Sequence, residues 1–248
     1  MSTIVSGFVS NVNERYSDSV KRYYENGRIL IKSITPKVIF VDEIMFDLIG
    51  TDYDKSNTLI IKIIKTDSYL YNYTSYINKF SINSTCHSKD TIEYMFTICN
   101  KTEWIRRAIY LNYFKTDNFI WVDFGIKYIF NESFSDEDFL NKINKLNDKK
   151  YNNVRIGGIW NISYDYNIDI YKDIYKDIAW YFAGGVFGGN IHSLEKFASL
   201  MNSKCIEIMT SKNTIMWEVN IWYLIYKENK SLFDIYNCNH NSSLIDNY

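Results

Sequence analysis

Short apolar segments that alternate with helical patterns constrain the fold of this chain more than any other feature. Residues 3–9, 37–41, 58–64 and 119–122 are rich in β-branched and aromatic side chains and have no polar face. Such runs are typical of strands that are covered on both sides in a parallel sheet. Since 46% of the residues are hydrophobic, the 248-residue chain can also bury a full core.

The segments between these strands predict helices. Ser17 or Asp18 can cap a helix that runs to Ile31, before the single proline at position 36. One or two helices are expected over residues 91–113. Ser135 begins a capping box, and two amphipathic helices follow from positions 193 and 214. The pattern predicts an α/β single domain with a mostly parallel central sheet flanked by helices, beginning in the order β-α-β-β.

The later strands are harder to place. Residues 154–160 and 178–182 predict strands, and the second runs into the glycine-rich segment 183–189. Clustered glycines indicate either a tight turn or bulge, or a backbone that a ligand approaches closely. We expect one domain over residues 1–236 and a polar C-terminal tail over 237–248.

Composition and charge exclude several classes of function. The net charge is -1, so the chain lacks the excess of basic residues that binds a nucleic-acid backbone. The N-terminus does not resemble a signal peptide, and no apolar run approaches the ~20 residues of a transmembrane segment. The four cysteines have no metal-binding or disulfide-scaffold spacing. We therefore expect a soluble cytoplasmic protein, in the host cytoplasm if the source is viral.

Two carboxylates are candidates for chemistry. Asp123 follows the strand 119–122 directly, at the end of a strand where α/β proteins bind ligands. It can hold a ribose hydroxyl or a divalent ion, or it can cap a turn. Glu218 lies among Trp217, Val219 and Trp222. Apolar surroundings would raise its pKa and suit it to proton transfer, although a first-turn glutamate that interacts with the helix dipole explains it equally well.

Three segments in order resemble the HtrL/YibB-like glycosyltransferase family, a GT-A-type group found in bacterial surface-glycan clusters and large DNA viruses. The first is K-x-x-W-x-x-x-A-x-x-x-N, from Lys101 to Asn112, leading into F-x-W-V-D-x-G-I over residues 119–126. The second is the glycine-rich segment 183–189, and the third is Glu218 on the following helix. The likeness spans nearly the whole chain.

The resemblance implies a site for a nucleotide-sugar donor. Residues 8–15 would lie under the base and ribose, and Lys101 near the diphosphate. Asp123 would stand for the metal-binding D-x-D motif, whose second aspartate is replaced here by Gly125. His240 corresponds in position to a C-terminal histidine ligand. The donor-binding residues would be Phe8, Val9, Ser10, Asn11, Arg15, Lys101, Trp121, Val122, Asp123, Gly184, Gly185 and Gly188.

The function expected from this resemblance is transfer of a sugar from a nucleotide sugar, a UDP-sugar in the first instance, to a glycan or small-molecule acceptor. Mn²⁺ or Mg²⁺, with Asp123 and His240 as ligands, or basic side chains would stabilise the leaving diphosphate. Glu218 would act as general base and Asp123 would also be catalytic. Because the second aspartate is missing, a nucleotide- or glycan-binding protein without catalysis is the alternative.

Overall fold

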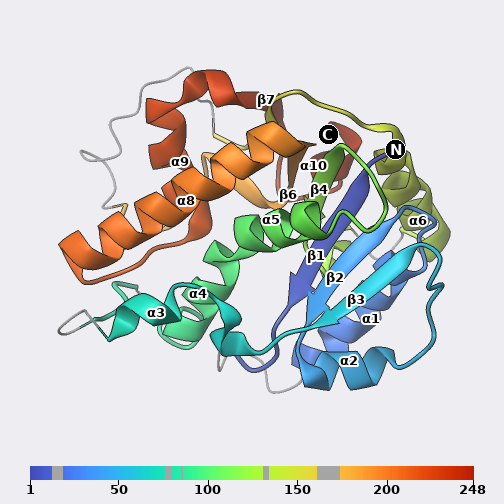
Figure 1. Cartoon of the computed structure of the whole chain (residues 1–248), viewed down its shortest axis with the longest axis horizontal. Coiled ribbons are helices and arrows are strands. Elements are labelled where there is room, and N and C mark those ends of the chain that lie inside the picture. Colours follow the sequence, from blue (N-terminus) through green and yellow to red (C-terminus); the bar gives the residue numbers. More distant parts are fainter. Residues whose placement is uncertain (13–18, 76–79, 85, 131–133, 161–173) are drawn as a thin grey trace.

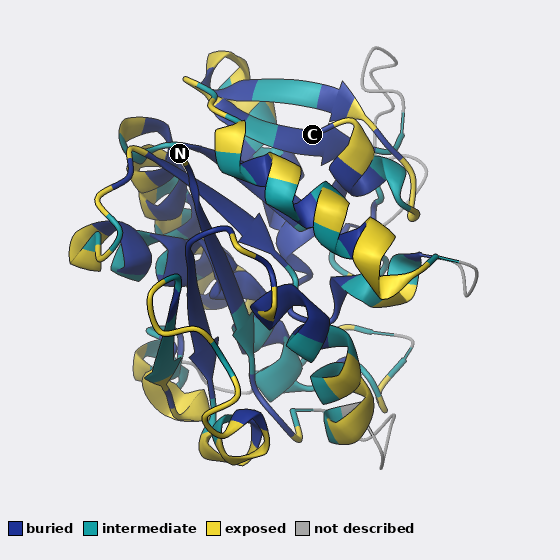
Figure 2. Ribbon diagram, turned by 90° about the vertical axis from the view of Figure 1, so that its right-hand side faces the viewer, coloured by how far each residue is buried: buried dark blue, intermediate teal, exposed yellow. Residues whose placement is uncertain are grey.

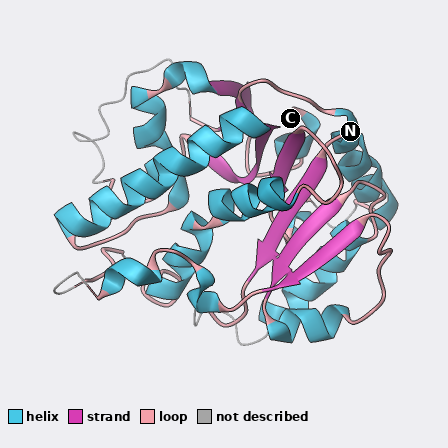
Figure 3. Cartoon of the chain, in the orientation of Figure 1, coloured by secondary structure: helices cyan, strands magenta, loops and turns pink. Residues whose placement is uncertain are grey.

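One mixed sheet runs through the molecule (Figure 3). The computed structural model describes residues 1–12, 19–75, 80–84, 86–130, 134–160 and 174–248. The strands are β1 (Thr3–Phe8), β2 (Lys37–Val41), β3 (Thr58–Lys62), β4 (Asn118–Val122), β5 (Val154–Gly158), β6 (Phe182–Asn190) and β7 (Phe233–Asn237). Their order across the sheet is β3-β2-β1-β4-β6-β5-β7. β6 is antiparallel to β4 and β5, and the other described pairs are parallel, as the sequence predicted.

Helices cover both faces of this sheet (Figure 1). The set α4, α5, α8 and α9 packs on one face, and α1, α2, α6 and α10 lie on the other. Their bounds are α1 (Ser19–Ile31), α2 (Glu43–Ile49), α3 (Tyr71–Thr74), α4 (Ile92–Cys99), α5 (Lys101–Leu111), α6 (Asp136–Lys145), α8 (Ile191–Lys212), α9 (Glu218–Glu228) and α10 (Ser243–Asp246).

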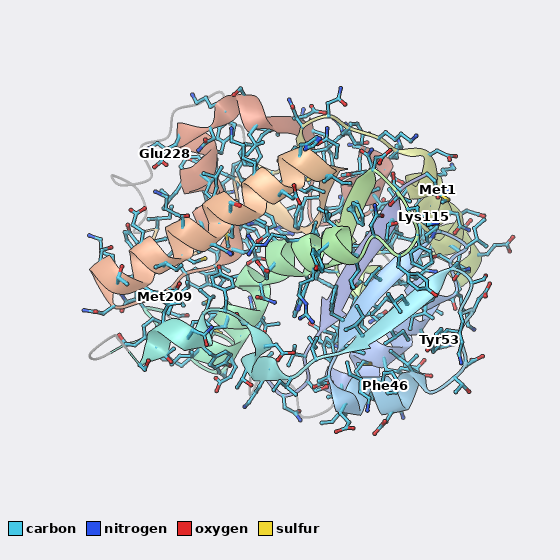
Figure 4. The ribbon with its side chains drawn as sticks, viewed as in Figure 1. Met1, Phe46, Tyr53, Lys115, Met209 and Glu228 are labelled. Carbon is cyan, nitrogen blue, oxygen red and sulfur yellow. The ribbon has the colours of Figure 1, made fainter. Side chains whose placement is uncertain are left out.

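The buried strands explain why the sequence predicts this architecture. Every residue of β2 and of β4 is buried, and Figure 2 shows the strands dark blue between helices with exposed outer faces. Side chains that are apolar in both directions fit a strand covered by helices on both sides. Met1 and Lys115, labelled in Figure 4, mark the end of the sheet where β1 and β4 begin.

One helix was missed. The sequence predicted two consecutive strands after the first helix, but α2 separates β2 from β3, so the chain begins β-α-β-α-β. The helix has seven residues and begins where the side chain of Asp42 accepts a hydrogen bond from the backbone nitrogen of Met45 (3.1 Å). A helix this short shows little periodicity in its sequence, so its capping residue, Asp42, is the only local sign of it.

The glycine-rich segment is the second correction. Residues 183–189 belong to β6 itself, whereas residues 178–181 of the predicted strand lie outside it. An added Cβ at Gly188 would lie 2.5 Å from the carbonyl oxygen of Phe119, and one at Gly189 would lie 2.6 Å from that of Asn153. Here the glycines let neighbouring chain segments pack closely. Of the alternatives left open for them, a tight turn does not occur, but the pairing of β6 with β5 shifts register between Ile156 and Gly158, as at a bulge.

The C-terminal segment packs against the sheet. The polar tail predicted from residue 237 onward contributes the buried side chains of Leu244, Ile245 and Tyr248. A Cβ on Gly188 would lie 2.4 Å from the hydroxyl of Tyr248 and would collide with it. Helix α9 also begins later than expected, at Glu218. Ser135 caps α6, since its hydroxyl accepts from the backbone nitrogen of Asp138 at 3.0 Å, while the carboxylate of Asp138 accepts from that same hydroxyl at 2.6 Å.

Across the described part of the chain, none of the helices combines the length and apolar character needed to cross a bilayer.

Candidate active site

A cavity of about 490 Å³ opens at the carboxyl ends of β1 and β4. Residues at the end of β1, on the inner side of α1, along α4 and α5, after β4, in β6 and at the start of α9 line its wall. In parallel α/β sheets this edge is where ligands bind, because the backbone turns away there and leaves a crevice. The cavity therefore lies where the position of Asp123 in the sequence predicted a site.

Most of the predicted site residues meet in this cavity, although they come from distant parts of the sequence. A backbone hydrogen bond from the nitrogen of Asp123 to the oxygen of Gly185 (2.9 Å) joins the end of β4 to β6. The predicted residues that line the cavity are Phe8, Val9, Asn11, Lys101, Trp121, Asp123, Gly184, Gly185, Glu218 and His240.

Three predicted donor-binding residues do not line it. Ser10 is buried, and both its backbone nitrogen (2.7 Å) and its hydroxyl (3.1 Å) donate to Asp42, so it holds the β1 loop against α2. Val122 points into the core, because alternate residues of a strand face opposite sides. Gly188 packs under Tyr248. Arg15 lies outside the described residues.

An ion-paired cluster of three side chains stands in the cavity wall. The Nζ atom of Lys101 lies 2.9 Å from Oδ1 of Asp123 and 2.9 Å from Oε1 of Glu218. It also donates to the carbonyl oxygen of Gly184 at 3.0 Å. A Cβ on Gly184 would come within 2.5 Å of Oε1 of Glu218, so glycine at this position leaves room for the cluster.

The charges of this cluster determine the state of its lysine. Burial favours the neutral amine, but the carboxylates of Asp123 and Glu218 outweigh it and hold the pKa of Lys101 above its ordinary value. Lys101 is therefore an ammonium at neutral pH. With two carboxylates and one ammonium, the cluster carries a net charge of about -1 when all three groups are ionised.

Glu218 combines burial with a position at the start of a helix. It is the first residue of α9 and its side chain is 8% exposed. The neighbouring Trp217 is also buried and donates from its indole nitrogen to Oδ1 of Asp90 at 3.2 Å, which fixes the start of the helix. The sequence did not show the ammonium beside it, because Lys101 is far away along the chain.

Two donors hold Asp123 in place. Its Oδ1 atom accepts from Nε1 of Trp121 at 2.6 Å in addition to its contact with Lys101. At Gly125, where a second aspartate would stand, a Cβ would lie 2.5 Å from the ring of Tyr23. An aspartate there would collide with this ring in its present position.

The two predicted metal ligands have no third candidate beside them among the described residues. Asp123 and His240 both line the cavity, but this part of the chain holds no group of three or more histidine, cysteine, aspartate or glutamate side chains placed to share an ion. His240 packs edge-on against Trp180, with ring centroids 4.3 Å apart. Partial burial lowers the pKa of His240, which favours its neutral form.

Several residues of the cavity were missed by the sequence analysis. Arg22, Tyr23 and Asn26 share one face of α1, and their i, i+1, i+4 spacing could have marked them. Lys89, Tyr94 and Trp180 lie in loops or on short helices, where no local pattern pointed to them.

Solved structures with a similar fold are glycosyltransferases. Mouse xyloside xylosyltransferase 1 matches with a TM-score of 0.51 at 10% identity, covering 96% of this chain and 86% of that one. The galactosyltransferase LgtC, solved with donor and acceptor sugar analogues, matches with a TM-score of 0.50 at 12% identity, covering 95% and 73%. The chain has the GT-A fold.

The sequence comparison identifies the family. Residues 12–243 match HtrL_YibB, described as a bacterial protein of unknown function, and the chain belongs to this family. The resemblance predicted from the three segments is confirmed. No curated protein matches the chain.

Proposed function

We propose that this protein is a glycosyltransferase that moves a sugar from a nucleotide-sugar donor, a UDP-sugar in the first instance, to a glycan or small-molecule acceptor. The observation that carries this proposal is the cluster of Lys101, Asp123 and Glu218 in the wall of a large cavity at the carboxyl edge of a GT-A sheet. Charged groups and aromatic rings share this cavity, as binding of a sugar nucleotide requires.

The nucleotide would enter beside β1 and α1. Phe8 and Tyr23 pack with ring centroids 4.7 Å apart, and both line the cavity beside Asn11. The flat apolar rings of Phe8 and Tyr23 can pack against a base and ribose, and the carboxamide of Asn11 can form hydrogen bonds with the polar atoms of these groups. Asp123 would then lie close to the ribose or the diphosphate.

The sugar and the acceptor would meet beside Glu218. A general base must be within hydrogen-bond reach of the acceptor hydroxyl and must carry no proton. The ammonium of Lys101, 2.9 Å away, stabilises a negative charge on Glu218, and Gly184 keeps the backbone close without filling the space. Glu218 would accept the proton of the acceptor hydroxyl as the sugar leaves the diphosphate.

The test is release of nucleoside diphosphate or monophosphate from UDP-, GDP-, dTDP- and CMP-sugars, each with a panel of mono- and disaccharide acceptors. We expect nucleotide release with one class of donor. In Asp123→Asn the rate of this release should fall about 100-fold or more, because the carboxylate of Asp123 and the ammonium of Lys101 both contribute to stabilising the transition state. Glu207→Gln is the matched control, because Glu207 forms an ion pair with Lys204 and is 62% exposed. Full activity in Asp123→Asn would refute the assigned site.

A binding protein without catalysis is the second candidate, and one observation favours it. Both carboxylates of the cluster are ion-paired to Lys101, and the position of the second aspartate is a glycine. Such a protein would bind a nucleotide sugar, and its melting temperature would rise with ligand concentration. Binding without release of the nucleotide would favour this candidate, whereas turnover would exclude it.

A further inference from the structure

We infer that this site binds the diphosphate of its donor without a divalent metal ion, because the ammonium of Lys101 is already fixed at the carboxylates that such an ion would use; for the chemistry of the ligand, this inference rests on the proposed function. The sequence led us to expect Mn²⁺ or Mg²⁺ on Asp123 and His240. The contacts of these residues argue against a bound divalent ion.

The contacts of Lys101 come first. Its three ammonium hydrogens meet three acceptors, since Asp123, Glu218 and the carbonyl of Gly184 lie 2.9, 2.9 and 3.0 Å from Nζ. A dication bound to either carboxylate would lie next to this ammonium and be repelled by it, most strongly where the site is shielded from water. Lys101 and a metal ion therefore compete for the same oxygens.

Asp123 has little capacity left on the oxygen that faces the cluster. Oδ1 accepts from Nε1 of Trp121 at 2.6 Å as well as from Lys101. Two N–H donors occupy the lone pairs of this oxygen, so a metal ion would have to displace one of them or bind Asp123 through Oδ2 alone.

A second acidic ligand is also missing beside Asp123. Gly125 has no side chain, and the ring of Tyr23 occupies the space into which an aspartate would extend. His240 offers one nitrogen, whereas Mg²⁺ prefers oxygen ligands, and the described residues provide no group of three candidate ligands, so water and the diphosphate would have to supply most of its coordination.

The charges lining the cavity can attract the diphosphate directly. Among the described residues that line it, Arg22, Lys89 and Lys101 are basic, and Asp123 and Glu218 are acidic. Three positive and two negative groups leave one positive charge, His240 being counted as neutral. A cavity with a positive balance concentrates an anion without an added cation.

The experiment measures Mn²⁺ binding and nucleotide binding separately. Protein treated with EDTA is titrated with Mn²⁺, and free Mn²⁺ is followed by electron paramagnetic resonance, alone and with UDP, GDP, CDP or dTDP present. We expect wild type to show no saturable Mn²⁺ site, and a nucleotide to raise the melting temperature equally in EDTA and in Mn²⁺. Saturable binding to wild type that Asp123→Asn abolishes would overturn the inference.

Two variants sharpen the result. Lys101→Ala removes the competing ammonium, so it should gain a saturable Mn²⁺ site that wild type lacks, and a folded Lys101→Ala without such a site would contradict the competition. Lys204→Ala removes an ammonium that pairs with Glu207 and Glu228 and does not line the cavity, and should leave Mn²⁺ binding as it is in wild type. If Lys101→Ala does not fold, the Mn²⁺ titration of wild type still tests the inference. If no nucleotide binds under any condition, the proposed function is contradicted, while the Mn²⁺ titration without nucleotide still tests the competition by Lys101.

Discussion

Replacing Lys101 with methionine tests whether the charged cluster holds the site together. Methionine keeps most of the volume of the side chain but removes the ammonium, so Asp123 and Glu218 are left without their shared partner. Glu218 is 8% exposed and Asp123 is 33% exposed, so water can solvate Asp123 far better than Glu218. Removing one member of a buried ion pair costs about 3–5 kcal/mol.

We expect Lys101→Met to lose about 3 kcal/mol of unfolding free energy, the lower end of that range, because Asp123 is partly solvated. The measurement is urea denaturation at neutral pH, followed by tryptophan fluorescence. The pKa of Lys101 is raised in the folded state, so its stabilising contribution is fully present below the ordinary lysine value of 10.5 and is lost only in more alkaline solution. Neutral pH therefore reports the whole effect.

Two comparisons identify the cause. Lys62→Met makes the same substitution in an exposed ion pair, whose side chains are 50% and 76% exposed, and should cost about 0–1 kcal/mol. Adding Glu218→Gln to Lys101→Met removes the unpaired buried charge and should recover part of the loss. Equal losses in Lys101→Met and Lys62→Met would refute the view that this cluster is a buried, coupled unit.

Three further substitutions address the neighbouring structure. Gly184→Ala places a Cβ 2.5 Å from Oε1 of Glu218, so we expect it to displace that carboxylate and lower donor turnover at least about tenfold; unchanged turnover would show that Glu218 is not the base. Gly125→Asp should lose about 1–3 kcal/mol in urea denaturation by overpacking against Tyr23, and adding Tyr23→Ala should relieve this; no relief would mean that another neighbour opposes the side chain. Burial lowers the pKa of Lys37 to about 7, so the unfolded chain binds more protons than the folded one above that value, and the unfolding free energy should rise from about pH 7 toward pH 10. Lys37→Met should remove this rise, and a pH profile identical to that of wild type would contradict it.

The strands that the sequence predicted well are those whose own residues determine their state. Residues 37–41 are apolar and β-branched, and β2 covers the same five positions. The glycines of residues 183–189 have no such preference, and they lie in β6 because this segment pairs with β4 on one side and β5 on the other, Gly188 with both. Their structure is decided by partners far away in the chain, which local patterns do not show.

The residues of the candidate site also fall into two groups, those that local sequence predicts and those that depend on contacts between distant segments. Asp123 was predicted from the strand before it, and Glu218 from the apolar residues around it. Their shared contact with Lys101 was not predicted, because it joins α5, the end of β4 and the start of α9. Ser10 was predicted as a donor-binding residue from the family resemblance, but its hydrogen bonds to Asp42 are visible only once β1 and β2 are placed side by side.

The position of β6 has a consequence for synthesis on the ribosome. β1 to β4 can pair as soon as residue 122 has emerged, but β6, which covers the free edge of β4, ends at residue 190. At roughly 5–20 residues per second, the apolar edge of β4 stays open for several seconds in every nascent chain. Unpaired strand edges template aggregation, so slowed translation between these two points should lower the yield of folded protein.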